Sequence, residues 1–356
     1  MRLLAALLRF FASLLRRLPL RPRVALLSRQ SAAPSLDYRL LAEELRARLG
    51  QEAVVVRLSD PETKRPVRFA LNTARQLYYA CTSKVVIVDG YVPAVSIPRK
   101  DERIFVVQLW HALGAIKKFG YQCLDTPAGR SSESARAGRM HRNYDLVVAG
   151  GPGAVDAYAQ AFDCPRHLVK PLGLPRVDYL LDERDDGPHA VRMRRLAERF
   201  PFLDGEERIV LYAPTLRSGA ARREGWLTDA VRAVAADVEG TGALCVVAAH
   251  PLDRDFDPAL LDEFACLRRV EGAATIDLAG FADELVTDYS SVAFEAALIG
   301  VPVRFYAPDL DEYRASPGLN VDVAAAGQDD LRAYLAGIGP GATARIADEI
   351  EGALTR

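Results

Sequence analysis

The sequence predicts an α/β protein with two Rossmann-like domains that face each other across a cleft. Three observations lead to this prediction. Short apolar runs typical of buried strands alternate with helical patterns, which indicates parallel sheets with helices on both faces. The alternation stops near residues 171–187 and then restarts. With 356 residues, of which 50% are hydrophobic, the chain is also long enough to bury two cores.

The predicted first domain covers residues 23–175 and the second covers residues 176–340. Strands of the first are expected at 23–30, 53–58, 85–92, 104–110 and 144–151, with helices at 36–49, 67–82 and 152–162. Strands of the second are expected at 208–214, 243–250, 285–287 and 301–306, with helices at 188–200, 226–239, 258–265 and 292–298.

Residues 1–22 predict a basic amphipathic helix at a membrane surface. Residues 1–23 contain six arginines and no acidic residue. Arg2, Arg9 and Arg16 recur every seven residues and line one helical face, while leucines and phenylalanines lie mostly on the other. The arginines interrupt any transmembrane span or secretory signal. A helix of this kind lies on an anionic membrane; the alternative is a helix that packs on the protein's own core.

Composition and charge exclude several classes of protein. The 46 basic and 47 acidic residues give a net charge of −1, which provides no global charge for nucleic-acid binding. Five single cysteines without a CxxC pair favour a reducing compartment over a disulfide or zinc framework. The Asp255 and Asp257 pair has DxD spacing but lies in an expected loop, so no required metal and no cofactor are implied.

A polar turn, Asp288 to Ser291, separates a buried strand from a helix. Free N–H groups at the start of this helix suit an anion such as a pyrophosphate. Position favours this interpretation, because open α/β sheets bind ligands at the carboxyl ends of their strands. The alternative is that Ser290 or Ser291 serves as an ordinary N-cap that binds nothing.

Three further polar residues end predicted strands. His111 is placed to accept a proton from a hydroxyl near neutral pH, although a lone histidine is often structural. His250 ends a strand of the second domain, where a cationic ring is stabilised beside a pyrophosphate. Arg217 suits a bidentate phosphate contact, and a solvated loop cation is the alternative. Lys117 and Lys118 either steer an anionic acceptor or form a solvated pair.

Five segments together carry a resemblance to a known family. They are ADELVTDYSSVAFEAALIGVPVRFYAPDLDEY from Ala282, VVQLWHALGAIKKFGY (106–121), PLGLPRVDYL (171–180), LYAPTLR (211–217) and VVAAHP (246–251). In this order and spacing they resemble the CDP-glycerol glycerophosphotransferase family, the teichoic-acid polymerases and primases. The resemblance covers roughly residues 104–320. It implies a GT-B fold with the donor nucleotide mostly on the C-terminal domain, and a C-terminal helix (341–356) that returns to the N-terminal one.

The resemblance also implies roles for individual residues. His111 matches the general base of the family's WHG motif, with Ala112 in place of the glycine, and His250 matches a histidine that contacts the donor phosphates. Glu295 would accept hydrogen bonds from the ribose hydroxyls. The remaining assignments are donor binding by Arg217, Thr287, Asp288, Ser290 and Ser291, and an acceptor side at Gly114, Lys117 and Lys118. Pro317, where the family usually has arginine before glycine, is a departure near the donor.

The sequence therefore predicts a peripheral enzyme on the cytoplasmic face of the membrane. It would transfer glycerol phosphate from CDP-glycerol to a hydroxyl of a lipid-linked cell-wall glycopolymer or primer and release CMP. Three alternatives remain: a CDP-ribitol ribitolphosphotransferase, a GT-B glycosyltransferase that uses nucleotide sugars, and an inactive membrane-bound scaffold of the same pathway.

Overall fold

The computed structural model describes residues 2–60, 66–217, 223–248 and 255–355, and it divides the chain into two compact α/β units. Unit 1 consists of Met1–Leu113, Phe119–Asp178 and Gly337–Arg356, and unit 2 consists of Gly114–Lys118 and Tyr179–Ala336. Each unit is built on one parallel sheet, so the predicted α/β fold with two Rossmann-like sheets is confirmed.

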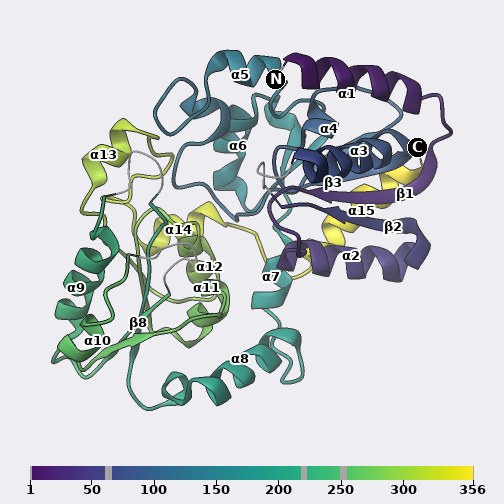
Figure 1. The fold of residues 1–356 in the computed structure, drawn as a ribbon. Helices are drawn as coiled ribbons and strands as arrows, with labels where there is room; N and C mark the ends of the chain where they lie inside the picture. Colours follow the sequence, from purple (N-terminus) through teal and green to yellow (C-terminus); the bar gives the residue numbers. More distant parts are fainter. Residues whose placement is uncertain (1, 61–65, 218–222, 249–254, 356) are drawn as a thin grey trace. The chain divides into compact units, whose positions relative to one another are not determined.

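Unit 1 contains a six-stranded sheet in the order β2-β1-β3-β4-β5-β6 (Figure 1). All neighbouring strands are parallel. The strands are β1 (Arg21–Ser28), β2 (Val54–Leu58), β3 (Ser83–Val88), β4 (Phe105–Gln108), β5 (Leu146–Ala149) and β6 (Val169–Pro171). Central strand β1 reads as a continuous apolar run because helices cover both faces of the sheet, and Ala25, Leu26 and Leu27 are fully buried.

Helices surround this sheet. They are α1 (Arg2–Leu15), α2 (Leu36–Leu49), α3 (Pro66–Thr82), α4 (Pro93–Ser96), α5 (Ser132–Ala137), α6 (Val155–Phe162), α7 (Pro175–Leu180, which runs into unit 2) and α15 (Ala342–Thr355). Helices α2 and α15 lie together on one face and α3 lies on the other, with α1 outside α3 (Figure 1). Arg48 of α2 donates to Asp348 and Glu351 of α15, at 2.7 and 2.9 Å. The C-terminal helix is therefore part of unit 1.

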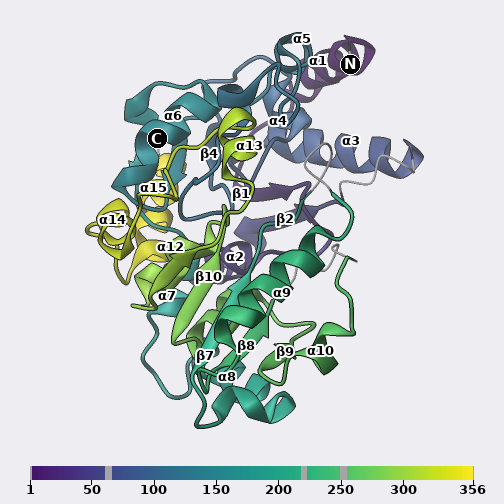
Figure 2. The ribbon, with the colours of Figure 1, turned by 90° about the vertical axis from the view of Figure 1, so that its left-hand side faces the viewer.

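Unit 2 contains a five-stranded parallel sheet in the order β11-β10-β7-β8-β9 (Figure 2). Its strands are β7 (Ile209–Ala213), β8 (Leu244–Val247), β9 (Leu267–Arg269), β10 (Glu284–Thr287) and β11 (Val303–Phe305). Its helices are α8 (Pro188–Arg199), α9 (Trp226–Val238), α10 (Leu260–Glu263), α11 (Thr275–Leu278), α12 (Val292–Leu298), α13 (Leu310–Ala315) and α14 (Gln328–Tyr334). One hydrophobic core lies between the sheet and α9 with α10, and a second lies under α8, α11 and α12.

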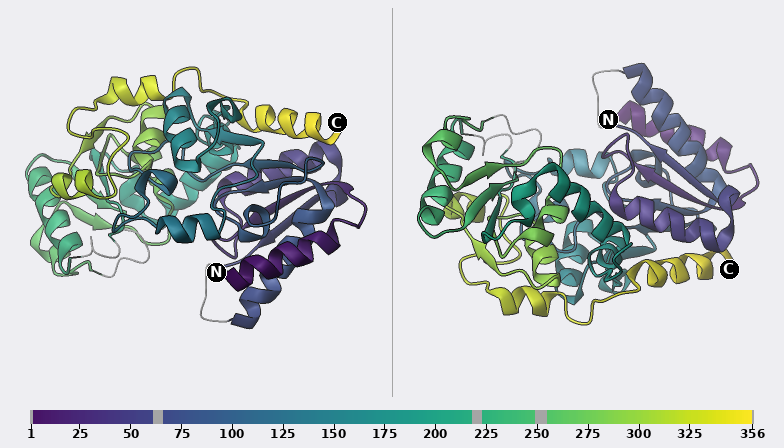
Figure 3. Two further views of the ribbon diagram at one scale, coloured as in Figure 1. Left: turned by 90° about the horizontal axis from the view of Figure 1, so that it is seen from above. Right: turned by 90° about the horizontal axis from the view of Figure 1, so that it is seen from below.

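The N-terminal helix has two apolar faces. Ala5, Leu8 and Ala12 are buried, and α1 lies side by side with α3 (Figure 3). The second face is exposed and consists of Leu3, Leu7, Phe10, Phe11 and Leu14. The small alanines let the helix approach unit 1 closely while the large side chains point away. Among the helices in the described ranges, none combines the length and hydrophobicity that a membrane span requires.

The arginines of α1 do not form a uniform outer stripe. Arg9 is exposed, but Arg16 turns back to the protein, where it donates to the Arg99 carbonyl and lies 3.6 Å from the Asp101 carboxylate. One face of this segment packs on the protein and another exposes large apolar side chains, and its attachment to a membrane stays a prediction.

The chain also departs from the predicted division at residues 171–187. Gly114–Lys118, expected in the first domain, belongs to unit 2. There Lys118 N–H donates to the Gly318 carbonyl at 2.9 Å and Asn320 N–H donates to the Ile116 carbonyl at 2.7 Å. This short segment pairs with an extended stretch near residue 319. It therefore belongs to a different unit from the residues that precede and follow it in the sequence.

Candidate active site

In unit 1, a tight turn after β4 presents His111. Trp110 has a φ of 60°, a left-handed conformation that costs about 1–2 kcal/mol in a residue other than glycine. Its N–H donates to Oε1 of Gln108 at 2.9 Å, and its ring stacks on Phe119 with centroids 4.7 Å apart. These contacts hold the strained turn, and they fix the His111 ring against Trp110 at 4.0 Å.

The hydrogen bond that His111 makes defines its tautomer. Nδ1 lies 2.9 Å from the main-chain carbonyl of Asp89, which follows β3. A carbonyl only accepts, so Nδ1 carries the proton and Nε2 of the neutral ring presents a lone pair. Desolvation by the surrounding protein lowers the pKa of His111, although the residue is exposed. The ring is therefore neutral at pH 7 and able to accept a proton at Nε2.

A charged pair supports the same turn. Arg176 donates to the His111 carbonyl at 2.9 Å, and its Nε donates to the buried Asp37 carboxylate at 3.0 Å. The Asp89 side chain is also buried, and burial raises its pKa to about 6 although the Ser28 hydroxyl opposes the shift. None of these residues was predicted from the sequence to have a role. For Asp89, the signal present in the sequence is an acid directly after a buried strand.

In unit 2, the turn after β10 is built around Asp288 and Arg217. Asp288 is fully buried and accepts from the Thr215 N–H at 2.9 Å and from Arg217 Nη1 at 2.8 Å. Arg217 Nε and Nη2 also donate to the two oxygens of Asp309, at 2.9 and 3.0 Å. Burial lowers the pKa of Arg217, but the charges of Asp288 and Asp309 more than compensate and raise it.

This network changes the role of Arg217. Four of its N–H groups donate to protein oxygens, the fourth to the Thr215 carbonyl at 2.9 Å, and its guanidinium lies 3.8 Å from the Trp226 ring centroid. It is neither the solvated loop cation nor the open phosphate ligand that its position at a strand end suggests. Arg217 organises the loops that follow β7, β10 and β11. Asp309, its bidentate partner, lies 92 residues away in the sequence, so sequence spacing gives no signal for this pair.

The other predicted donor residues surround this network. The Thr287 hydroxyl is buried and donates to the Ala213 carbonyl at 2.6 Å, which ties β10 to β7. Ser290 and Ser291 are partly exposed at the start of α12; the N-cap residue Ser291 makes no capping bond with its side chain, whereas the Ser290 hydroxyl accepts from the Val292 N–H at 3.4 Å. Glu295 is only 2% exposed, so it is not a surface glutamate. His250 lies outside the described residues.

The predicted acceptor-side residues belong to unit 2 as well. Burial lowers the pKa of Lys117, and the nearby charge of Asp288 opposes this shift, so Lys117 is not a solvated surface cation. Lys118 is exposed. Gly114 is tightly enclosed: a Cβ there would lie 2.4 Å from the Phe294 ring and 2.7 Å from the Tyr334 ring. Within the described ranges, no group of three or more acidic, histidine or cysteine side chains is arranged to hold a metal ion.

Comparison with known proteins identifies the family. The model of the family described as CDP-glycerol:poly(glycerophosphate) glycerophosphotransferase matches residues 10–329. The chain belongs to this family.

Two curated relatives of this glycerophosphotransferase family come from Bacillus spizizenii. A teichoic acid ribitol-phosphate primase is 34% identical over 252 residues, which cover 69% of this chain and 62% of that protein. A teichoic acid glycerol-phosphate primase is 28% identical over 249 residues, covering 70% and 62%. The chain thus spans about three fifths of the length of these relatives.

The structure of the wall teichoic acid polymerase TagF has a similar fold. It aligns with a TM-score of 0.70 at 16% identity and covers 98% of this chain and 93% of that chain. At this identity the likeness concerns the fold, and it agrees with the predicted GT-B type.

Proposed function

We propose that this member of the glycerophosphotransferase family transfers a polyol phosphate from its CDP-activated form to a hydroxyl of a lipid-linked cell-wall glycopolymer or primer, and releases CMP. The observation that carries the proposal is the neutral His111 ring, with Nε2 available at the carboxyl edge of a Rossmann-like sheet. The family match over residues 10–329 supports the choice of substrate class. The polyol is glycerol, as the family description indicates, or ribitol, as the 34% identical primase indicates.

The proposed step is an in-line displacement at phosphorus. Nε2 of His111 takes the proton of the acceptor hydroxyl while its oxygen attacks the β-phosphorus of the CDP-polyol. The bond between this phosphorus and the bridging oxygen breaks, and that oxygen leaves with CMP. The main-chain carbonyl of Asp89 accepts a hydrogen bond from Nδ1–H of His111. Asp89 therefore orients the ring without taking part in the proton transfer.

The donor side is proposed at the turn of unit 2. Ser290, Ser291, Thr287 and Glu295 would surround the nucleotide, with His250 at the phosphates. Asp288 and Arg217 would set the shape of the turn rather than contact the donor, because their polar atoms are engaged with each other and with the loops.

We also propose that the reaction requires no divalent metal or other cofactor, since protein groups can stabilise the negative charge that develops on the leaving CMP. Turnover after treatment with EDTA and gel filtration, with and without added Mg²⁺, tests this. Loss of turnover that Mg²⁺ restores would contradict it.

The exposed face of α1 supports attachment to an anionic membrane, at the cytoplasmic face where nucleotide-activated donors are found. Leu7, Phe10 and Phe11 are 46%, 58% and 49% exposed, and Arg9 next to them is exposed. Large apolar side chains with neighbouring arginines are typical of helices that lie in the interface of an anionic bilayer.

A donor panel tests the proposed function. The purified protein is incubated with a short polyol-phosphate acceptor and with CDP-glycerol, CDP-ribitol or a set of nucleotide sugars. Release of CMP from one CDP-polyol is expected. Release of a nucleoside diphosphate from a nucleotide sugar would instead establish the glycosyltransferase alternative, and absence of turnover with every donor and acceptor would favour the scaffold.

A further inference from the structure

Arg29 is a partly buried cation at the carboxyl end of β1. Within the described ranges it makes no hydrogen bond or ion pair with a carboxylate, and its guanidinium lies 5.2 Å from the Phe69 ring centroid. Arg176 and Arg217 each pair with a buried acid, whereas the buried Arg23 donates to the hydroxyls of Ser83 and Thr82. Burial lowers the pKa of Arg29. Removing a cation from water without a partner is costly, so such a group is typically retained for a ligand.

A second cation lies on the same side of the sheet. Arg130 lies 5.2 Å from the Tyr91 ring centroid, and Tyr91 itself is held by a 2.7 Å hydrogen bond to the Gly138 carbonyl. Arg29 and Arg130 are close enough to repel each other, and both act on Tyr91, whose pKa burial raises to about 12. Two like charges that both act on one tyrosine attract an anion.

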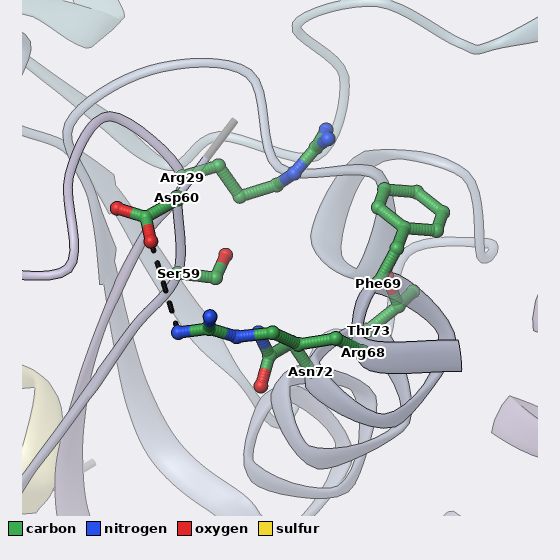
Figure 4. Close-up of a pocket in the computed structure, with 7 residues that line it drawn as sticks. All are labelled: Arg29, Ser59, Asp60, Arg68, Phe69, Asn72 and Thr73. Atoms are coloured by element: carbon green, nitrogen blue, oxygen red, sulfur yellow. Dashed lines mark ion pairs between the residues drawn. The ribbon is translucent and has the colours of Figure 1, made fainter. Parts of the chain in front are cut away.

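The pocket beside Arg29 contains groups that suit a phosphate. It is lined by Arg29, Ser59, Asp60, Arg68, Phe69, Asn72 and Thr73 (Figure 4). Arg68 turns towards Asp60, 3.8 Å away, while Arg29 extends along Phe69 (Figure 4). Asp60 is thus occupied by Arg68 and by the Ala32 N–H at 2.9 Å. No ion pair joins Arg29 to Asp60, and Asn72 and Thr73 supply uncharged hydrogen-bonding groups, while the Ser59 hydroxyl bonds to Ser28 and Gln76.

The pocket lies on the same edge of the sheet as His111. In the order β2-β1-β3-β4, Arg29 follows β1, Asp89 follows β3 and His111 follows β4. Parallel strands are about 4.8 Å apart, so the ends of β1 and β4 are separated by about 10 Å. A polyol phosphate chain that lies along this edge would extend from Arg29 to His111.

We propose that Arg29 and Arg130 bind a phosphate ester of the acceptor and thereby hold its terminal hydroxyl near His111. The inference rests on the proposed function, because it takes the acceptor to be a chain that already contains polyol phosphate or a lipid-linked phosphate.

The test measures binding without turnover. Full-length protein is titrated by calorimetry with a glycerol phosphodiester dimer, with the phosphate-free polyol and with inorganic pyrophosphate, in the absence of donor. Arg29→Gln and Arg130→Gln should each weaken binding of the dimer about tenfold or more, as expected for loss of a charge-assisted hydrogen bond. Arg75→Gln, which removes an exposed arginine of α3, is the matched control and should bind normally. Stronger binding of pyrophosphate than of the dimer would identify the lipid-linked phosphate as the group recognised.

Kinetics separate this proposal from the proposed function. In Arg29→Gln the KM for a phosphate-containing acceptor should rise with kcat nearly unchanged, while the dissociation constant of CDP stays the same. Equal affinity of the wild type and both variants for the dimer and for pyrophosphate would overturn the inference, as would weaker CDP binding with unchanged dimer binding. Because the titration needs no donor, loss of the proposed function would show as absent turnover while the binding difference persists.

Discussion

At the scale of single residues, His111 depends on backbone geometry as much as on its own chemistry. The left-handed turn at Trp110 aims the ring, and the Asp89 carbonyl fixes the proton on Nδ1. A histidine that carried its neutral-form proton on Nε2 could not act as the base. Position at a strand end therefore indicates a candidate, and the tautomer decides what the candidate can do.

Replacing His111 should abolish most of the turnover. His111→Asn is expected to lower kcat about 10²-fold or more with an unchanged dissociation constant for the donor, because a general base acts in the transition state. In the wild type, the rate should fall as the pH falls through the pKa of His111, which lies below 6.5. A pH–rate profile measures this. A midpoint above pH 7, or near-normal turnover of the variant, would remove His111 from the mechanism.

Asp89 should make the stability of unit 1 depend on pH. Its pKa is raised by burial from 3.8 to about 6, so the folded protein binds the proton more tightly than the unfolded chain. The stabilisation is complete below about pH 4 and is lost as the pH rises to about 6; a shift of about 2 units corresponds to about 3 kcal/mol.

This dependence is measurable through Trp110. In a Trp226→Phe background, Trp110 of unit 1 is the remaining tryptophan, and its fluorescence reports urea unfolding. The free energy of unfolding of Asp89→Asn should differ from that of the wild type, and this difference should change by about 3 kcal/mol between pH 4 and pH 7. The same difference at both pH values would show that Asp89 titrates normally.

At the scale of elements, the long helices and most strands were predictable, including the edge strands β2 and β11, but the edge strands β6 and β9 were not. The helix expected at 36–49 is α2, and the strand expected at 53–58 is β2 with one residue fewer. β6 and β9 have three residues each and lie at the edges of their sheets, too short to show any periodicity. The candidate site was also only partly predictable. His111 was found from its position at the end of a predicted strand, whereas the partners of Arg217 come from distant loops and only the tertiary structure reveals them.

Arg217 should matter for the stability of unit 2. Arg217→Ala would leave Asp288 and Asp309 without their shared cation, and breaking a buried ion pair in this way costs about 3–5 kcal/mol. Urea unfolding followed by Trp226 in a Trp110→Phe background is the measurement. Arg217→Lys should recover only part of the loss, since lysine cannot bond both oxygens of Asp309 in the same fork. A change below about 1 kcal/mol in Arg217→Ala would contradict the structural role.

The exposed face of α1 should bind membranes independently of the buried face. Leu7→Gln with Phe10→Gln leaves Ala5, Leu8 and Ala12 in place, so folding should be unaffected. Cosedimentation with vesicles containing anionic lipid should fall strongly, while turnover on a soluble acceptor is retained. Leu261→Gln, which changes an exposed leucine of α10 in unit 2, is the control. Vesicle binding that is equal in all three proteins would exclude α1 as the anchor.

At the scale of the whole molecule, neither unit is a continuous piece of chain. Unit 2 takes Gly114–Lys118 from the middle of the first half, and unit 1 takes Gly337–Arg356 from the end. Composition and periodicity cannot reveal either exchange, because a segment of five residues has no pattern of its own and a terminal helix has the same pattern wherever it packs.

This exchange has a consequence for synthesis on the ribosome. Domains usually complete in the order in which they are made, the N-terminal one first. Here α2 and β3 are covered by α15 (Ala342–Thr355), so unit 1 cannot complete until α15 has been translated. Unit 2 needs nothing beyond Ala336, and its inserted segment has long since emerged. The half of the protein that is translated second is therefore the first that can be finished.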